Sequence, residues 1–349
     1  MTSSISTRLP GWIANQTGNR AYRQAGDNTY SCRHVEPSEH VPTLLEDAQT
    51  GLLSKPRSLP PKYFYDEAGS ALFDRICDTR EYYPTRAESA LLQRHAPQII
   101  EKTRPEYIVE LGSGTSRKTR FLFDACAVLG EQPEYWPMDV CEPLLIETAQ
   151  SLTADYQWLS VNALVGDYHG GFDYFPGTSG DSLYLFLGGT IGNFSQRQAV
   201  DLLTRLRALM NGNDRLLLGF DRVKDSAALE AAYNDAEGVT AEFNLNLLRV
   251  LNEGLDADFD VEAFAHRAIY NRDDARIEMY LEAKSRQRVE LAALGESLLI
   301  EKGERILTEI SRKFTSAAIE NLLRESGFCM ASHYESGQPA YSLVLAEPE

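Results

Sequence analysis

Two acidic residues and one aromatic residue stand close behind short, mainly apolar runs that are typical of buried strands. Asp139 follows residues 134–138, and Asp167 and Tyr168 follow residues 161–165. A carboxylate at a strand end can accept hydrogen bonds from both hydroxyls of a ribose. A second carboxylate can accept a hydrogen bond from an adenine amino group, beside an aromatic ring that contacts the base. Together these residues predict an adenosine-binding site.

A glycine turn precedes both acids. The apolar strand pattern at residues 107–111 leads into Gly112, Ser113 and Gly114, and a helical pattern begins at Arg117. Such a turn is equally compatible with a structural role, although its glycines let the backbone approach a ligand and the helix N-terminus presents free N–H groups. Arg117 occupies the third glycine position of the G-x-G-x-x-G pattern, which disfavours a pyrophosphate. An adenosine site without phosphates predicts S-adenosylmethionine as the cofactor.

Composition limits the classes of protein that need consideration. The 349 residues include 34 basic and 51 acidic residues, and the net charge of −17 disfavours binding to nucleic acid or anionic membrane. No apolar run approaches the roughly 18 residues of a membrane span, and the N-terminus has no apolar signal-peptide core. The five cysteines form no C-x-x-C pair, and the six histidines are scattered. We therefore expect a cytoplasmic, monomeric protein with reduced thiols and no metal site.

Helices and strands alternate through the middle of the chain, which predicts a mostly parallel sheet with right-handed crossovers. A late helix and a two-stranded hairpin then predict an antiparallel last strand. We expect an α/β, Rossmann-like fold with an inserted α+β domain. We expect a flexible arm at 1–35, a cofactor-binding domain at 80–224 and 284–349, and a substrate-binding domain at 36–79 and 225–283.

Two further patterns lie outside the cofactor motifs. Residues 63–83 contain six aromatic side chains, whose composition favours half-buried packing over a lid above a ligand. Residues 276–283 alternate with a period of two, so Glu278 and Tyr280 point to the same face of a strand. By pattern alone, Glu278 is an ordinary solvated carboxylate, and Asn193 has a turn or N-cap role.

Several motifs, in order along the chain, resemble those of the histidine Nα-methyltransferases of ergothioneine biosynthesis. The resemblance covers nearly the whole chain beyond the arm. Its motifs are Tyr82-Tyr83-Pro84-Thr85-Arg86, the segment Glu110-Leu111-Gly112-Ser113-Gly114-Thr115-Ser116 with Lys118 and Thr119, Gly188-Gly189-Thr190-Ile191-Gly192-Asn193, and Ile277-Glu278-Met279.

The resemblance implies that the fold is that of the class I methyltransferases and that the inserted domain binds substrate. It also implies S-adenosylmethionine-dependent trimethylation of the α-amino group of L-histidine to hercynine. Related enzymes methylate tryptophan derivatives, so another amino acid is the alternative substrate. The cofactor residues that the resemblance implies are Gly112, Ser113, Lys118, Asp139, Asp167 and Tyr168. The substrate residues that it implies are Tyr65, Phe73, Tyr82, Gly188, Asn193, Tyr233, Glu278 and Tyr280.

The resemblance also implies chemical roles and shifts the interpretation of the tyrosines towards a lid. Asn193 and Tyr82 would hold the amine as catalytic residues, and Glu278 would accept a hydrogen bond from the imidazole. The family often carries a small hydroxyl residue two positions after the glutamate, where this chain has Tyr280. A nicotinamide oxidoreductase and a non-catalytic binding module remain competing classes. Arg117 argues against the first, and retention of Asp139 and Asn193 argues against the second.

Overall fold

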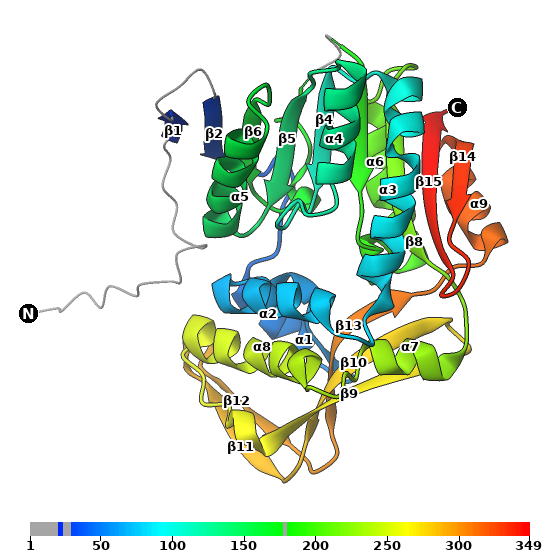
Figure 1. The fold of residues 1–349 in the computed structure, drawn as a ribbon. Helices are drawn as coiled ribbons and strands as arrows, with labels where there is room; N and C mark the ends of the chain where they lie inside the picture. The colour runs from blue at the N-terminus through cyan, green and yellow to red at the C-terminus, as the bar shows by residue number, and fades with distance from the viewer. Residues whose placement is uncertain (1–19, 24–28, 177–179) are drawn as a thin grey trace, which may run out of the picture.

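A computed structural model describes residues 20–23, 29–176 and 180–349. Nine strands of this part of the chain form one sheet, in the order β1-β2-β6-β5-β4-β7-β8-β15-β14 (Figure 1). In that order they span Arg20–Arg23, Thr29–His34, Val161–Val165, Glu134–Asp139, Tyr107–Leu111, Ser182–Phe186, Arg215–Asp221, Tyr341–Pro348 and Phe328–Glu335. The pairs from β2 to β8 are parallel, whereas β15 runs antiparallel to β8 and to β14. The predicted sheet with an antiparallel end is confirmed.

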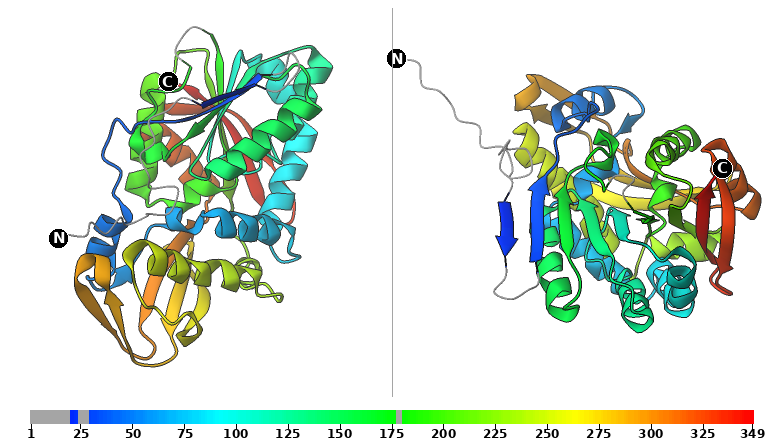
Figure 2. Two further views of the ribbon diagram at one scale, coloured as in Figure 1. Left: turned by 90° about the vertical axis from the view of Figure 1, so that its left-hand side faces the viewer. Right: turned by 90° about the horizontal axis from the view of Figure 1, so that it is seen from above.

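Helices cover both faces of this sheet, which is why its central strands are apolar on both faces (Figure 2). The β7 strand, for example, is buried at every position. One face packs against α3 (Tyr83–Thr103), α4 (Arg120–Leu129) and α5 (Glu142–Asp155). The other packs against α6 (Gln196–Leu209) and α9 (Ser316–Glu325). A capping box of Ser195 and Gln198 begins α6.

A second, smaller sheet lies below the large one in Figure 1. Its order is β3-β13-β10-β9, and the strands span Arg57–Ser58, Arg305–Arg312, Arg276–Ala283 and Phe264–Asn271. Its core includes residues of α1 (Leu44–Gly51), α2 (Glu67–Asp78), α7 (Ser226–Ala232) and α8 (Val239–Leu255). The hairpin of β11 (Gln287–Leu291) and β12 (Glu296–Ile300) joins the same core. The inserted segment therefore extends to Arg312 and does not end at residue 283 as expected, because β13 pairs with β10.

The N-terminal prediction also needs correction. Residues 29–34, expected within a flexible arm, form β2 and pair in parallel with β6, and Tyr30 and Cys32 are buried. Residues 20–23 pair with β2 as β1. These segments lack a clear period of two, and the edge of the large sheet supplies the hydrogen bonds that order them. The remainder of the predicted arm up to residue 28 lies outside the described residues.

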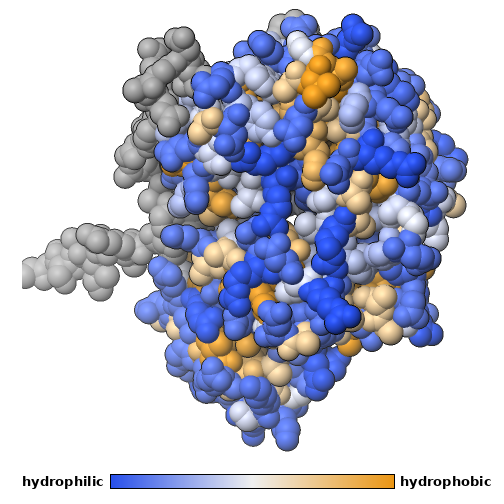
Figure 3. All heavy atoms as spheres, in the orientation of Figure 1, coloured by the Kyte–Doolittle hydropathy of each residue, from blue (hydrophilic) through white to orange (hydrophobic). Residues whose placement is uncertain are grey.

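The face shown in Figure 3 is largely hydrophilic, with small scattered apolar patches. In the described ranges, no helix combines the length and apolar character needed to cross a membrane. Nor do those ranges bring together three His, Cys, Asp or Glu side chains in a way that could hold a metal ion.

Candidate active site

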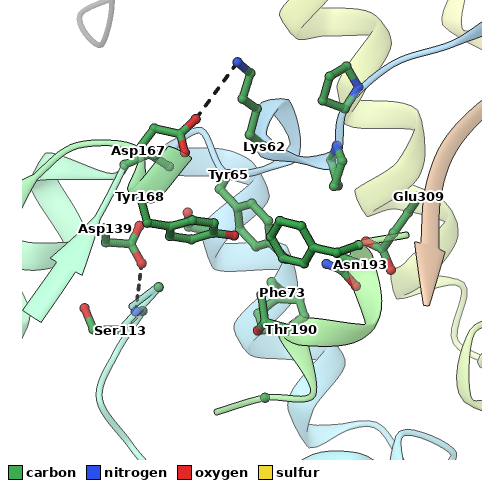
Figure 4. A pocket seen from close by; sticks show the side chains of 18 of the residues that line it. Lys62, Tyr65, Phe73, Ser113, Asp139, Asp167, Tyr168, Thr190, Asn193 and Glu309 are labelled. Atoms are coloured by element: carbon green, nitrogen blue, oxygen red, sulfur yellow. Dashed lines mark hydrogen bonds and ion pairs between the residues drawn. The ribbon is translucent and has the colours of Figure 1, made fainter. Parts of the chain in front are cut away.

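A cavity of about 640 Å³ lies where the carboxyl ends of the central parallel strands face the smaller sheet (Figure 4). Its lining comes from the loops after β4, β5, β6 and β7, from α2, and from β13. Asp139, Ser113 and Asp167 stand at one end, and Asn193 and Glu309 at the other. Ligands of open α/β sheets bind at this edge because successive strands end there and their loops diverge. The two ends differ in chemistry and are described in turn.

The predicted glycine turn forms the floor of the first end. Gly112 and Gly114 have φ values of +66° and +52°, which favour glycine. The Gly114 N–H donates to the Asp139 carboxylate at 2.9 Å, so the turn and the end of β5 hold each other in place. The Ser113 hydroxyl oxygen is buried and has no hydrogen-bond partner in the described part of the chain. A buried hydroxyl of this kind is satisfied when a polar ligand enters.

The two predicted acids stand beside the turn. Burial raises the pKa of Asp139, which also accepts from the Cys141 N–H at 3.1 Å. Burial also raises the pKa of Asp167, but hydrogen bonds from His169 and the charge of Lys62 outweigh it and lower the pKa overall. Asp167 therefore stays ionised and retains acceptor capacity. The Tyr168 ring lies 3.8 Å from the position of a Cβ on Gly112, which places an aromatic surface across the turn.

Aromatic side chains enclose the middle of the cavity. The Phe73 ring lies 5.7 Å from Tyr65 and 6.3 Å from Tyr82, measured between centroids, and all three residues line the cavity. Burial raises the pKa of both tyrosines, so their hydroxyls remain neutral. The interpretation as packing is confirmed, and the interpretation as a lid stays a prediction. These rings pack on one another and also face the ligand space.

Gly188 and Asn193 lie in the turn after β7, and both line the cavity. Asn193 is the last residue of η3 (Thr190–Asn193), and the next helix is capped by Ser195, so Asn193 has no N-cap role. Its side-chain amide makes no hydrogen bond within the described ranges. A half-buried amide that serves no local structural role is available to a ligand.

The structure does not place Glu278 and Tyr280 at the cavity. The Glu278 carboxylate accepts from Arg276 at 2.6 Å, from Asn271 at 3.1 Å and from the Tyr280 hydroxyl at 2.6 Å. Both residues occupy the face of β10 opposite Met279, whose side chain belongs to the core beneath the cavity. The period of two correctly put Glu278 and Tyr280 on one face, but that face turns away from the ligand space.

Glu309 on β13 is the acid that the sequence analysis missed. It pairs with Met279 across the ladder, so its side chain lies on the cavity face, beside Asn193 in Figure 4. Within the described residues, its carboxylate has no hydrogen-bond or ion-pair partner. Burial raises its pKa to about 7, against the opposing charge of Lys313. The available signal was a single acid inside the β-prone run of residues 306–310, but this segment was not recognised as a strand.

Tyr233 lies one layer behind the cavity. Its ring packs against Tyr82 with centroids 6.0 Å apart, and it does not itself line the space. Its hydroxyl donates to Ser311 at 2.8 Å and accepts from Lys313 at 3.1 Å. The expected contact of Tyr233 with substrate is therefore replaced by a supporting role for Tyr82.

The unpartnered Glu309 carboxylate predicts a pH-dependent stability. Because its pKa rises from 4.5 to about 7 on folding, the folded protein keeps a proton that the unfolded chain loses between these values. Stability is consequently lost as pH rises through this window. We expect Glu309→Gln to be more stable than the original protein, with an advantage that grows from about pH 5 to about pH 8 by up to ~3 kcal/mol. Urea unfolding of both proteins across this range measures the difference, and a constant difference would contradict it.

Known proteins are similar to this chain in sequence. The sequence profile of the family described as "Histidine-specific methyltransferase, SAM-dependent" matches residues 44–348. The histidine N-alpha-methyltransferase of Mycobacterium tuberculosis is 45% identical over 311 residues, which cover 89% of this chain and 96% of that protein. The corresponding enzyme of Mycolicibacterium smegmatis is 41% identical over 87% of this chain and 94% of its own. The L-tryptophan methyltransferase of Psilocybe serbica is 26% identical over 87% and 92%, respectively.

Proposed function

The chain belongs to the histidine-specific, S-adenosylmethionine-dependent methyltransferase family, and we propose that it converts the α-amino group of L-histidine to the trimethylammonium of hercynine in ergothioneine biosynthesis. The near full-length similarity to two histidine N-alpha-methyltransferases supports this proposal. The observation that carries it is the pair Asn193 and Glu309 at the cavity end remote from Asp139, two polar side chains without a hydrogen-bond partner among the described residues. Such a pair suits an amino acid that carries a second hydrogen-bonding group on its side chain.

The residues at the first end fit an adenosine group. We assign the ribose to Asp139, the adenine amino group to Asp167 and the base to the Tyr168 ring. The Ser113 hydroxyl, Gly112 and Lys118 would contact the amino-acid part of the cofactor. When bound, S-adenosylmethionine supplies an electrophilic methyl group.

The chain itself must hold the substrate amine in line and keep its nitrogen unprotonated. An α-amine has an ordinary pKa of about 8, so it must lose a proton before it can attack. Asn193 can bind both the substrate carboxylate and the amine, and the neutral Tyr82 hydroxyl can accept from or donate to the nitrogen. Gly188 lines the cavity without a side chain and leaves room for added methyl groups. Holding the amine nitrogen in line with the reacting methyl group lowers the entropic part of the activation barrier.

Glu309 replaces Glu278 as the proposed partner of the imidazole. Ser311 stands two positions after it, so the family pattern of an acid followed by a small hydroxyl residue is met at β13, and Tyr280 poses no conflict. The Glu309 pKa of about 7 lies close to the ordinary imidazole pKa of about 6.5, so the two groups can share a proton at neutral pH. An indole N–H does not titrate in this range. This match favours histidine over a tryptophan derivative, which remains the second candidate because of the Psilocybe relative.

We further propose that the enzyme acts as a monomer in the cytoplasm. The five cysteines are free thiols and three of them are buried, which suits a reducing compartment. The largely hydrophilic face in Figure 3 gives no sign of a broad apolar contact.

Product analysis tests the proposed reaction directly. The protein is incubated with S-adenosylmethionine labelled in its methyl group and a panel of amino acids that includes histidine, tryptophan and their mono- and dimethylated forms. We expect histidine to gain three labelled methyl groups, as detected by mass spectrometry, with little label on tryptophan. Faster labelling of any other amino acid would overturn the substrate assignment. A thermal shift with NAD and none with S-adenosylmethionine would overturn the cofactor as well.

A further inference from the structure

Glu88 is a fully buried acid that the proposed reaction does not use. It lies on α3 with 0% of its surface exposed, and its carboxylate accepts hydrogen bonds from three different segments. The Lys118 ammonium donates at 2.5 Å, the Gly188 N–H at 2.9 Å, and the Tyr341 hydroxyl at 2.9 Å. These donors come from the cofactor loop, the turn after β7 and the antiparallel strand β15.

The surrounding backbone leaves room for this carboxylate. A Cβ on Gly219 of β8 would lie only 2.0 Å from a Glu88 carboxylate oxygen, so a larger residue would displace it. A buried carboxylate is stable only where charged and polar donors satisfy it, and here all three donors are in place.

Two of the three donors line the cavity and lie close to each other. Lys118 and Gly188 both line the cavity, and the Lys118 ammonium nitrogen lies 3.4 Å from the position of a Cβ on Gly188. Gly188 has a φ of +80°, and its N–H is held by Glu88. Glu88 therefore orients one residue of the proposed cofactor site and one residue of the proposed amine site at once.

Glu88 also controls the charge at this part of the cavity. Burial lowers the pKa of Lys118, but the charge and the hydrogen bond of Glu88 outweigh it, so the pKa is raised and the ammonium stays charged. An ammonium without its partner would repel the positive sulfonium of S-adenosylmethionine. It would not repel the neutral thioether of the product, S-adenosylhomocysteine.

We propose that Glu88 is a positioning residue that fixes the Gly188 turn and neutralises the charge of Lys118. The cavity can then bind the positively charged sulfonium cofactor without repulsion from the Lys118 ammonium. The inference rests on the proposed function in one respect, namely that S-adenosylmethionine binds in this cavity. It does not depend on which amino acid is methylated.

The test compares the Kd values of S-adenosylmethionine and S-adenosylhomocysteine by calorimetry at low salt. We expect Glu88→Gln to raise the ratio of the first Kd to the second roughly tenfold. Lys118→Met leaves Glu88 unpaired and should lower the ratio. The double variant Glu88→Gln/Lys118→Met should return the ratio close to its original value. Loss of a contact shared by the two ligands cancels in this ratio, so a merely structural role would not move it.

Tyr341→Phe serves as the matched control because it removes a hydrogen bond to Glu88 without changing charge, and it should leave the ratio unchanged. If circular dichroism shows that Glu88→Gln does not fold, the Kd ratio of the Lys118→Met variant still tests the proposal. An unchanged ratio in the folded Glu88→Gln or Lys118→Met variant would overturn the inference, as would shifts of both variants in the same direction. Failure of the original protein to bind either ligand would instead contradict the proposed function.

Discussion

Replacement of Glu309 by alanine is expected to lower kcat/KM for histidine by some tens- to thousand-fold. The proposed imidazole N–H would lose its acceptor inside a space closed by Tyr65, Phe73 and Tyr82. Loss of a charged hydrogen bond in such a space costs roughly 2–4 kcal/mol. A site built around one hydrogen bond discriminates strongly against side chains that cannot make it. Steady-state kinetics with histidine and tryptophan measure the effect, and the tryptophan rate should fall less or rise.

Glu278→Ala is the matched control, since it removes a buried acid of the same sheet that does not line the cavity. Its carboxylate is already satisfied by Arg276, Asn271 and Tyr280 on the far face. We expect this variant to lose stability but to keep its kcat/KM for histidine. A large loss of histidine turnover in Glu278→Ala, with Glu309→Ala unaffected, would restore the assignment made from the sequence.

Asn193→Ala should abolish productive amino-acid binding and leave cofactor affinity nearly intact. The proposed substrate carboxylate would enter the cavity without its amide partner, which costs roughly 2–4 kcal/mol. The η3 turn should survive, because the Asn193 side chain has no structural hydrogen bond in the described residues and Ser195 caps the next helix. Calorimetry with S-adenosylmethionine and kinetics with histidine separate the two effects.

Asn213→Ala, an exposed asparagine in the turn before β8, provides the control for this substitution. It should match the original protein in both measurements. Histidine kinetics in Asn193→Ala that also matched the original protein would mean that the turn after β7 has only a structural role.

Local patterns were sufficient to locate the strand ends and the glycine turn of the large sheet. A buried parallel strand is a continuous apolar run, and its carboxyl end is marked by the residue at which that run stops. Asp139, Asp167 and the glycine turn could therefore be located from their own neighbours in sequence. The Ser195 capping box and the end of α4 at Gly130 were predictable for the same reason, because capping acts within a single turn of helix.

Other strands of the molecule depended on contacts between distant segments. Residues 29–34 became a strand only because an edge of the large sheet was free to pair with them, and β13 joined the smaller sheet only by pairing with β10. The two-residue alternation of apolar and polar side chains is weak in both segments. Pairing with a neighbouring strand therefore supplies the stabilisation of their strand conformation that the local sequence lacks.

The choice between Glu278 and Glu309 shows most clearly what the sequence determines and what the tertiary structure decides. The sequence by itself determined that Glu278 and Tyr280 share one face of a strand, because side chains alternate along any strand. It could not determine which face of that strand meets the cavity. That depends on which side of the smaller sheet packs against its core helices and which side faces the large sheet. The ladder pairs Glu309 with Met279 and not with Glu278. The acid near the proposed substrate was therefore decided by strand register and by the layer packed against it, both of which arise only in the tertiary structure.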